Sequence, residues 1–234
     1  MAKFYGKNDS YLIKNDLKYY SYAVGLVILV LLVVWSIFKF ALPAIAGVAA
    51  LVGIFFLVQL ADPFIMFFRR KANRFYRGWS GEMDIKRELE NFSDEYSVFW
   101  DIVIGQNKGN IDFVVVGPNG VFMLEVKSHK GEVGFNGREI TLNGRNFPQT
   151  NVIKQVHGET WALKNYIKQQ TGAEVFVHSV LLFSSPYARM RFGYSQIENM
   201  SIIQKDFLPG LFARFPAISY NRPAVELVLA KAVV

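Results

Sequence analysis

Two long apolar segments without a charged residue lie near the start of the chain, at residues 19–38 and 41–61. Each is about as long as the ~20 residues that a helix needs to cross the hydrocarbon core of a bilayer. A secretory signal would have a shorter apolar stretch before a cleavage site, and a second span would not follow it at once. We therefore expect two transmembrane helices, although the pattern also allows a helical hairpin buried in a soluble core.

The order of the residues between the two segments predicts a tight hairpin. Only Lys39 and Phe40 separate the segments, and Pro43 stands in the first turn of the second, where proline is tolerated. Both ends of the hairpin should then emerge on one side of the membrane. These ends carry the basic residues Lys14, Lys18, Arg69, Arg70, Lys71, Arg74 and Arg77. Because cytoplasmic flanks are rich in lysine and arginine, we expect a multi-pass cell-membrane protein with both termini in the cytoplasm.

The remaining pattern divides the chain into four segments. We expect a cytoplasmic N-terminal tail at 1–18, the transmembrane hairpin at 19–68, a basic juxtamembrane linker at 69–77 and a soluble domain at 78–234. The last segment is long enough for one domain with its own core.

The soluble segment mixes helical and strand periodicities. Residues 81–92 predict a helix, because Ile85, Leu89 and Phe92 share one face and Ser80 is a suitable N-cap. A second helix is predicted over 151–170, with Gly172 ending it. The other expected elements are strands at 96–104, 110–116, 120–128 and 175–183, a hairpin within 131–146 and a short helix within 205–215. This order predicts an α/β fold in which a mixed sheet is flanked by helices.

Charge and cysteine content exclude several classes of site. Residues 1–77 hold ten Lys or Arg and three Asp, which accounts for the net charge of +7, whereas residues 78–234 hold 16 charges of each sign. The basic excess is therefore mainly a topology signal and only weak evidence for nucleic acid. The chain has no cysteine, which excludes disulfides, iron–sulfur clusters, thiolate zinc sites and a cysteine nucleophile. Its three histidines are too widely spread to suggest an all-histidine metal site.

Three charged residues interrupt apolar strands of the predicted sheet, where charge is rarely buried without a partner or a metal ion. Asp112 begins one strand, and Glu125 and Lys127 lie on one face of the next. A hairpin symmetric about the bond between Pro118 and Asn119 would place Asp112 opposite Glu125, with Lys127 diagonal to them.

Facing carboxylates repel each other, and a divalent cation between them would remove this cost. Such a pair beside a lysine suits metal-dependent hydrolysis of a phosphodiester. The alternative is a cross-strand salt bridge in which Lys127 neutralises Asp112 or Glu125. Glu82 shares the buried face of its predicted helix and can supply a third carboxylate, and Gln155 lies at the edge of the buried face of the second helix. Each residue could also have a purely structural role. Glu82 could interact with the helix dipole from the first turn, and Gln155 could lie on a solvated helix edge.

These residues together resemble the NERD (nuclease-related) domain, over roughly residues 75–185. The resemblance is carried by Gly81 and Glu82, by the segment 109–128 and by Gly131, with the stretch from Asp112 to Lys127 the most specific. It implies the PD-(D/E)xK nuclease-like fold, with a restriction-endonuclease-like core. By position it makes Asp112 and Glu125 the metal ligands, Lys127 the catalytic lysine, Glu82 the helix carboxylate and Gln155 the site glutamine. The family's Asn-Pro-x-x-Gln motif is present as residues 151–155, with valine in place of the proline.

The resemblance and the residues together predict a membrane-anchored nuclease that uses Mg²⁺ or Mn²⁺ to hydrolyse DNA at the cytoplasmic face. The balanced charge of residues 78–234 speaks against this, because duplex binders generally present a basic surface. The alternative is a membrane-tethered interaction or sensing module that keeps the fold without catalysis. A transporter or channel subunit is disfavoured, because neither apolar segment contains the charged residues that mark a transport pathway.

Overall fold

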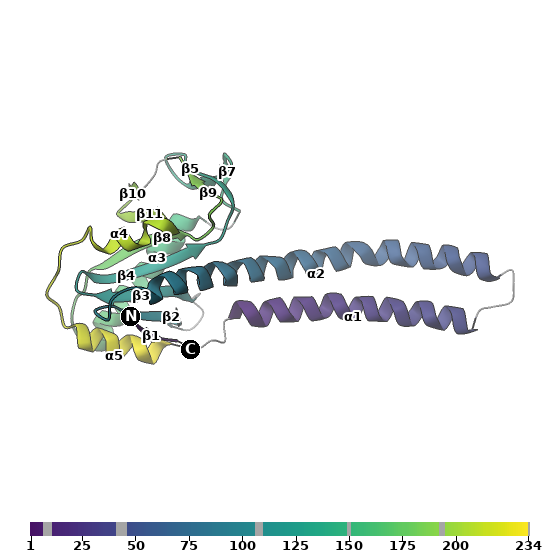
Figure 1. Cartoon of the computed structure of the whole chain (residues 1–234), viewed down its shortest axis with the longest axis horizontal. Helices are drawn as coiled ribbons and strands as arrows, with labels where there is room; N and C mark the ends of the chain where they lie inside the picture. The colour runs from purple at the N-terminus through teal and green to yellow at the C-terminus, as the bar shows by residue number, and fades with distance from the viewer. Residues whose placement is uncertain (7–10, 41–45, 106–109, 149–150, 192–194, 234) are drawn as a thin grey trace. The chain divides into compact units, whose positions relative to one another are not determined.

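The computed structural model describes residues 1–6, 11–40, 46–105, 110–148, 151–191 and 195–233. The chain forms two compact units (Figure 1). One unit comprises Asp9–Trp79, and the other comprises Met1–Asn8 together with Ser80–Val234. The second unit therefore contains residues from both sides of the predicted hairpin.

The unit of residues 9–79 consists of two antiparallel helices, α1 (Tyr11–Phe40) and most of α2 (Ala46–Glu90). The start of α1 lies beside the later turns of α2, because the Lys71 ammonium donates a hydrogen bond to the Tyr19 hydroxyl at 3.3 Å and the rings of Tyr19 and Phe75 stack at 5.6 Å. Lys39 and Phe40, which were predicted to connect the two segments, are instead the last residues of α1. Pro43, predicted in the first turn of the second helix, lies outside the described residues.

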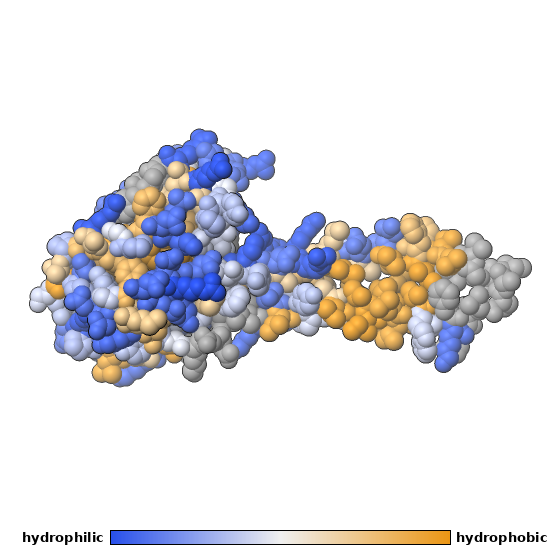
Figure 2. All heavy atoms as spheres, in the orientation of Figure 1, coloured by the Kyte–Doolittle hydropathy of each residue, from blue (hydrophilic) through white to orange (hydrophobic). Residues whose placement is uncertain are grey.

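Both helices are long and apolar enough to cross a membrane, judged by length and composition, at Lys14–Ser36 and Leu51–Glu90. Only 6% of each apolar window is buried within the structure. Apolar residues accordingly gather on the outside of this unit (Figure 2). A helical hairpin in a soluble core would bury such side chains, so the structure does not favour that alternative.

The second helix extends much further than its sequence pattern predicted. α2 continues from Ala46 to Glu90, through the predicted linker at 69–77 and the predicted helix at 81–92. Ser80 is therefore an interior helical residue, and its prediction as an N-cap was wrong. Residues 69–90 contain five Arg, two Lys and three Glu, which favour helix, and α2 has no proline after Pro63, so no proline ends the helix between the two units.

The second unit is built on a mixed sheet of seven strands in the order β1-β2-β3-β4-β8-β11-β10. Strands β2 to β4 form an antiparallel meander, whereas β8 runs parallel to β4 and β11 runs parallel to β8. Helix α3 (Val152–Thr171) makes the crossover from β4 to β8 and ends at Gly172 as predicted. The strand bounds are β1 Lys3–Tyr5, β2 Ser97–Ile102, β3 Ile111–Gly117, β4 Gly120–Lys127, β8 Val177–Phe183, β10 Ser195–Ile197 and β11 Met200–Gln204.

Helices cover both faces of this sheet, which confirms the predicted α/β fold (Figure 1). On one face, Val156 and Leu163 of α3 and Leu229 of α5 (Arg222–Ala232) pack into one hydrophobic cluster. On the other face, the last turns of α2 join α4 (Leu208–Phe212) in a second cluster through Ile85 and Leu89. Each fully buried side chain of this size stabilises the fold by about 1.5–3 kcal/mol, so both helices that carry site residues are held firmly on the sheet.

The first residues of the chain belong to the sheet, although the sequence predicted a tail over 1–18. Strand β1 pairs in parallel with β2, the Lys3 amide donates to the Tyr96 carbonyl at 2.9 Å, and the Tyr5 ring stacks on Phe99 at 4.8 Å. Three residues are too few to show a strand periodicity in sequence. The edge of β2 is thus covered by chain that precedes the apolar helices, which protects that edge from pairing with other chains.

A second sheet and several small elements complete the unit. The predicted hairpin at 131–146 is present as β5 (Gly131–Phe135) and β6 (Ile140–Leu142), followed by β7 (Arg145–Asn146), with β9 (Ala188–Met190) parallel to β5. The predicted helix at 205–215 is shorter, with a 3₁₀ turn at Lys205–Phe207 before α4. The sequence did not predict β9, β10, β11 or α5.

Candidate active site

The β3–β4 hairpin has the register that its turn predicted. Gly117 pairs with Gly120, and Phe113 pairs with Leu124. One position further along, the same register brings Asp112 level with Glu125. The Oδ2 atom of Asp112 accepts a hydrogen bond from the backbone amide of Val126 at 2.7 Å, which fixes the carboxylate against β4.

Glu125 and Lys127 lie two residues apart on one face of β4, and both are buried, at 4% and 7% exposure. The Lys127 Nζ atom donates to the Glu125 Oε1 atom at 2.5 Å. The alternative of a salt bridge that neutralises Glu125 is therefore present in the structure. It joins two residues of the same strand, β4, whereas the sequence suggested a bridge between neighbouring strands. Burying both charges is costly, and it is offset only when the pair is well placed and has further hydrogen bonds.

Gln155 supplies those further hydrogen bonds from the first turn of α3. Its Oε1 atom accepts from Lys127 Nζ at 3.2 Å, and its Nε2 atom donates to Glu125 Oε1 at 2.8 Å. The Asn151 side chain caps the helix by accepting from the amide of Lys154 at 3.2 Å. Valine at position 152 therefore leaves the helix start intact, and Gln155 reaches Lys127 and Glu125.

Glu82 approaches the same site from α2 and is buried, at 9% exposure, on the face predicted from Ile85 and Leu89. The preceding residue must be glycine for the helix to come this close. A Cβ atom at Gly81 would lie 2.5 Å from the Ser184 hydroxyl and 2.8 Å from the Ser128 Cβ, which is closer than real contacts allow. The five residues predicted from sequence are thus drawn from three elements of one unit, α2, the β3–β4 hairpin and α3.

Two further carboxylates belong to this group and were missed in the sequence. Asp101 in β2 lies between the pairs Trp100–Phe113 and Ile102–Ile111, so it is level with Asp112 on the neighbouring strand. Glu159 lies one helical turn after Gln155, whose Nε2 atom also donates to Glu159 Oε1 at 2.9 Å. The available signals were a charge inside an apolar strand for Asp101 and the i, i+4 spacing from Gln155 for Glu159.

This concentration of acids in a buried place shifts their protonation. Burial raises the pKa of Glu82 to about 8, and the neighbouring carboxylates of Asp101 and Glu125 add to the rise, while Trp100 and Lys127 oppose it. Burial, followed by the charge of Glu125, likewise raises the pKa of Glu159 to about 8. The pKa of Asp112 lies well above its usual range, first through burial and then through the charges of Glu125 and Glu82.

Lys127 shows the opposite balance. Burial lowers the pKa of its ammonium, but the charge of Glu125 and the hydrogen bond to it outweigh this effect, so the net pKa is raised. The site therefore keeps a firmly protonated lysine among several carboxyl groups.

The donor set fits a hard divalent cation in its chemistry. The Oε2 atoms of Glu125 and Glu159 are buried and have no hydrogen-bond partner within the described residues. Oxygen ligands are those that Mg²⁺ prefers, and a cation would offset the repulsion among Asp112, Glu125 and Glu82. Within the described residues, however, no three acidic or histidine side chains already stand as a ready-made metal cluster.

The raised pKa of Glu82 predicts that the metal-free protein loses stability as pH rises. Glu82 is protonated in the folded protein up to about pH 8 and ionises near 4.5 when unfolded, so the folded state binds more protons between these values. The free energy of unfolding should fall across this range, and Glu82→Gln should reduce the slope by about 1 kcal/mol per pH unit. Thermal or denaturant unfolding of the full-length protein in a chelator, from pH 5.5 to 8, measures this slope.

Glu132→Gln is the matched control for this measurement. Glu132 is partly exposed, and its hydrogen bond with Arg191 lowers its pKa, so it stays ionised in both states above pH 5.5. This variant should keep the slope of the parent protein. An unchanged slope in Glu82→Gln would show that Glu82 ionises normally in the fold.

The candidate site lies within a segment that matches a known protein family. Residues 77–184 match the family model described as the nuclease-related domain, NERD. No curated protein and no solved structure is significantly similar to the chain. The matched segment includes Glu82, Asp112, Glu125, Lys127 and Gln155, together with strands β2, β3, β4 and β8 and helix α3. The chain therefore carries a NERD nuclease-related domain at residues 77–184.

Proposed function

We propose that this protein is a membrane-anchored nuclease that uses Mg²⁺ or Mn²⁺ to hydrolyse phosphodiester bonds of DNA at the cytoplasmic face. One observation carries the proposal. Gln155 joins Lys127 and Glu125 in a single hydrogen-bonded group, and Asp112 lies level with Glu125 on the neighbouring strand. A domain that had kept only its fold would have no need for a buried lysine and glutamine positioned among carboxylates.

Asp112 and Glu125 are the residues that would hold the cation. When bound, the cation supplies a Lewis acid that polarises the phosphate and lowers the pKa of a bound water. The unpartnered Oε2 atom of Glu125 supports this assignment, since a buried carboxylate oxygen without a donor is costly.

The chain's own residues would supply orientation and charge. The Lys127 ammonium can orient the attacking water and stabilise negative charge on the phosphate in the transition state. Gln155 holds Lys127 and Glu125 at a fixed separation, so neither side chain has to reorganise during the reaction. Glu82, with a pKa of about 8, is a carboxyl group able to accept or release a proton near neutral pH.

The sheet supports the proposed anchor. Strand β1 precedes both apolar helices and pairs with β2, which follows them, within one compact unit. If the helices cross a membrane, both ends of the hairpin must therefore lie on the side of the nuclease domain. The basic residues that flank these ends then favour the cytoplasm.

Nuclease activity should depend on the lysine and on a metal-binding carboxylate. We expect the full-length protein in detergent to cleave DNA with Mg²⁺ or Mn²⁺, and expect Lys127→Ala and Asp112→Asn each to lose about 100-fold or more of the rate. The full chain is required, because a shorter chain would lack β1 and part of α2. Gel assays on plasmid and linear DNA, beside circular dichroism to confirm folding, make the measurement.

Lys130→Ala is the control for a nearby lysine. Lys130 is exposed and lies over the ring of Tyr187, so its loss should leave cleavage within about twofold of the parent. Equal cleavage by the parent and by both site variants, or no cleavage under either metal, would contradict the proposed activity and favour a non-catalytic interaction module.

Single-cysteine labelling can test the anchor, because the natural chain contains no cysteine to remove. Lys14→Cys and Asp94→Cys, introduced separately, should react with a membrane-impermeant maleimide only from the cytoplasmic side. Lys39→Cys at the end of α1 should react only from the opposite side. Reaction of the first two variants on opposite faces, or recovery of the protein without membranes, would contradict a hairpin anchor.

A further inference from the structure

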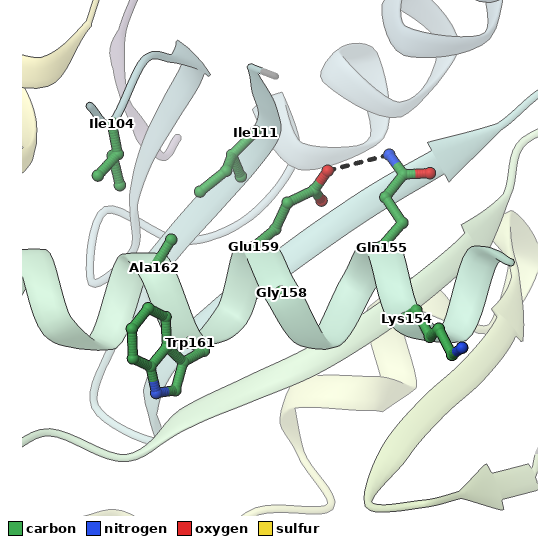
Figure 3. Close-up of a pocket in the computed structure, with 8 residues that line it drawn as sticks. All are labelled: Ile104, Ile111, Lys154, Gln155, Gly158, Glu159, Trp161 and Ala162. Atoms are coloured by element: carbon green, nitrogen blue, oxygen red, sulfur yellow. Dashed lines mark hydrogen bonds between the residues drawn. The ribbon is translucent and has the colours of Figure 1, made fainter. Parts of the chain in front are cut away.

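A cavity of about 360 Å³ opens beside the candidate active site (Figure 3). Helix α3 forms one wall, and Ile104, just beyond the end of β2, and Ile111, the first residue of β3, lie across from it. The residues that line it include Ile104, Ile111, Lys154, Gln155, Glu159 and Trp161. We refer to it as the α3 cavity.

The α3 cavity is continuous with the catalytic group through one side chain. Gln155 lines the cavity and also bonds to Lys127 and Glu125. Its Nε2 atom donates to Glu159, which lines the cavity too (Figure 3). A group bound in the cavity would therefore lie next to a phosphate held at Lys127.

The walls of the cavity suit a flat, partly apolar ring. Ile104 and Ile111 are buried apolar residues, and Trp161 keeps 65% of its surface exposed although it lines the cavity. Every nucleobase has a π-face that stacks on an aromatic side chain. A volume near 360 Å³ lies at the small end of ligand pockets, which suits one ring system and excludes a duplex.

The polar groups of the cavity suit the rest of a nucleotide. Glu159 lines the cavity, and a carboxyl group can bond to the edge of a base. Lys154 lies exposed on the adjoining turn, where it can meet a backbone phosphate.

We propose that the α3 cavity binds one unstacked base of single-stranded nucleic acid beside the scissile phosphodiester, with Trp161 as the stacking surface. This inference rests on the proposed nuclease function and narrows its substrate to strands whose bases are accessible. It also accounts for the balanced charge of residues 78–234, since capture of one base needs local contacts and not the broad basic surface of a duplex binder.

Binding can be measured apart from catalysis. The full-length Lys127→Ala protein in detergent, which should not cleave, is titrated with a fluorescent single-stranded oligonucleotide and with the matching duplex, and anisotropy gives both affinities. Adding Trp161→Ala should weaken single-strand binding about tenfold and change duplex binding less than twofold. Adding Trp161→Phe should restore most of the single-strand affinity, because a smaller ring still stacks.

Phe176→Ala is the matched control, since Phe176 is a similarly exposed aromatic residue, at 63%, that does not line the cavity. It should leave both affinities unchanged. A second control replaces single nucleotides of the oligonucleotide by abasic ones. An abasic nucleotide at one of these positions should lower the affinity of the Lys127→Ala protein for the oligonucleotide. It should not lower the affinity of the Lys127→Ala, Trp161→Ala protein any further.

The outcomes separate this inference from the proposed function. The base site is supported if Trp161→Ala lowers the affinity for single strands and an abasic nucleotide then has no further effect. This conclusion holds even if the parent protein does not cleave DNA. Unchanged affinity in Trp161→Ala, or an equal loss for duplex and single strand, overturns the base site even if the parent protein cleaves DNA.

Discussion

A buried lysine between buried carboxylates is the interaction on which the site depends. Glu125 and Lys127 are removed from water on the same face of β4, where neither charge is stable alone. Each is retained because it bonds to the other and because Gln155 contributes both a donor and an acceptor. The arrangement works only if the hairpin register, the helix start at Asn151 and the crossover to β8 are all correct. The buried charges of Glu125 and Lys127, which are unfavourable without their partners, therefore constrain the fold around the site.

Several carboxyl groups of this site are not fully satisfied by hydrogen bonds or by opposite charges. Glu125 and Glu159 each have an oxygen without a partner in the described part of the chain, and Glu82 and Asp112 hold protons well above the usual carboxyl range. A protein selected only for stability would replace such groups by apolar side chains of similar volume. Buried titratable groups with shifted pKa values, one of which, Glu159, lines an open cavity, are typical of a site that binds a charged ligand.

The sequence predicted the centre of the structure better than its edges. The hairpin register followed from the turn at Pro118 and Asn119, because a two-residue turn leaves little freedom in pairing, and the face of Glu82 followed from the helical period. The continuation of α2 through residues 69–80 and the strand role of residues 3–5 did not follow. A helix continues past a predicted boundary when no local residue ends it, and a three-residue strand exists only because β2 offers its edge. Glu159 and Asp101 were missed because surface glutamates and single aspartates are common, and only the folded chain places these two beside Asp112 and Gln155.

Direct measurement of cation binding tests the central claim that this carboxylate group is a metal site. Thermal unfolding of the full-length protein with increasing Mn²⁺ should show a midpoint that rises with concentration, because a ligand that binds only the folded state stabilises it. The double variant Asp112→Asn, Glu125→Gln should show no such rise. A midpoint that does not respond to Mn²⁺ in the parent protein, or that rises equally in the double variant, would contradict the account.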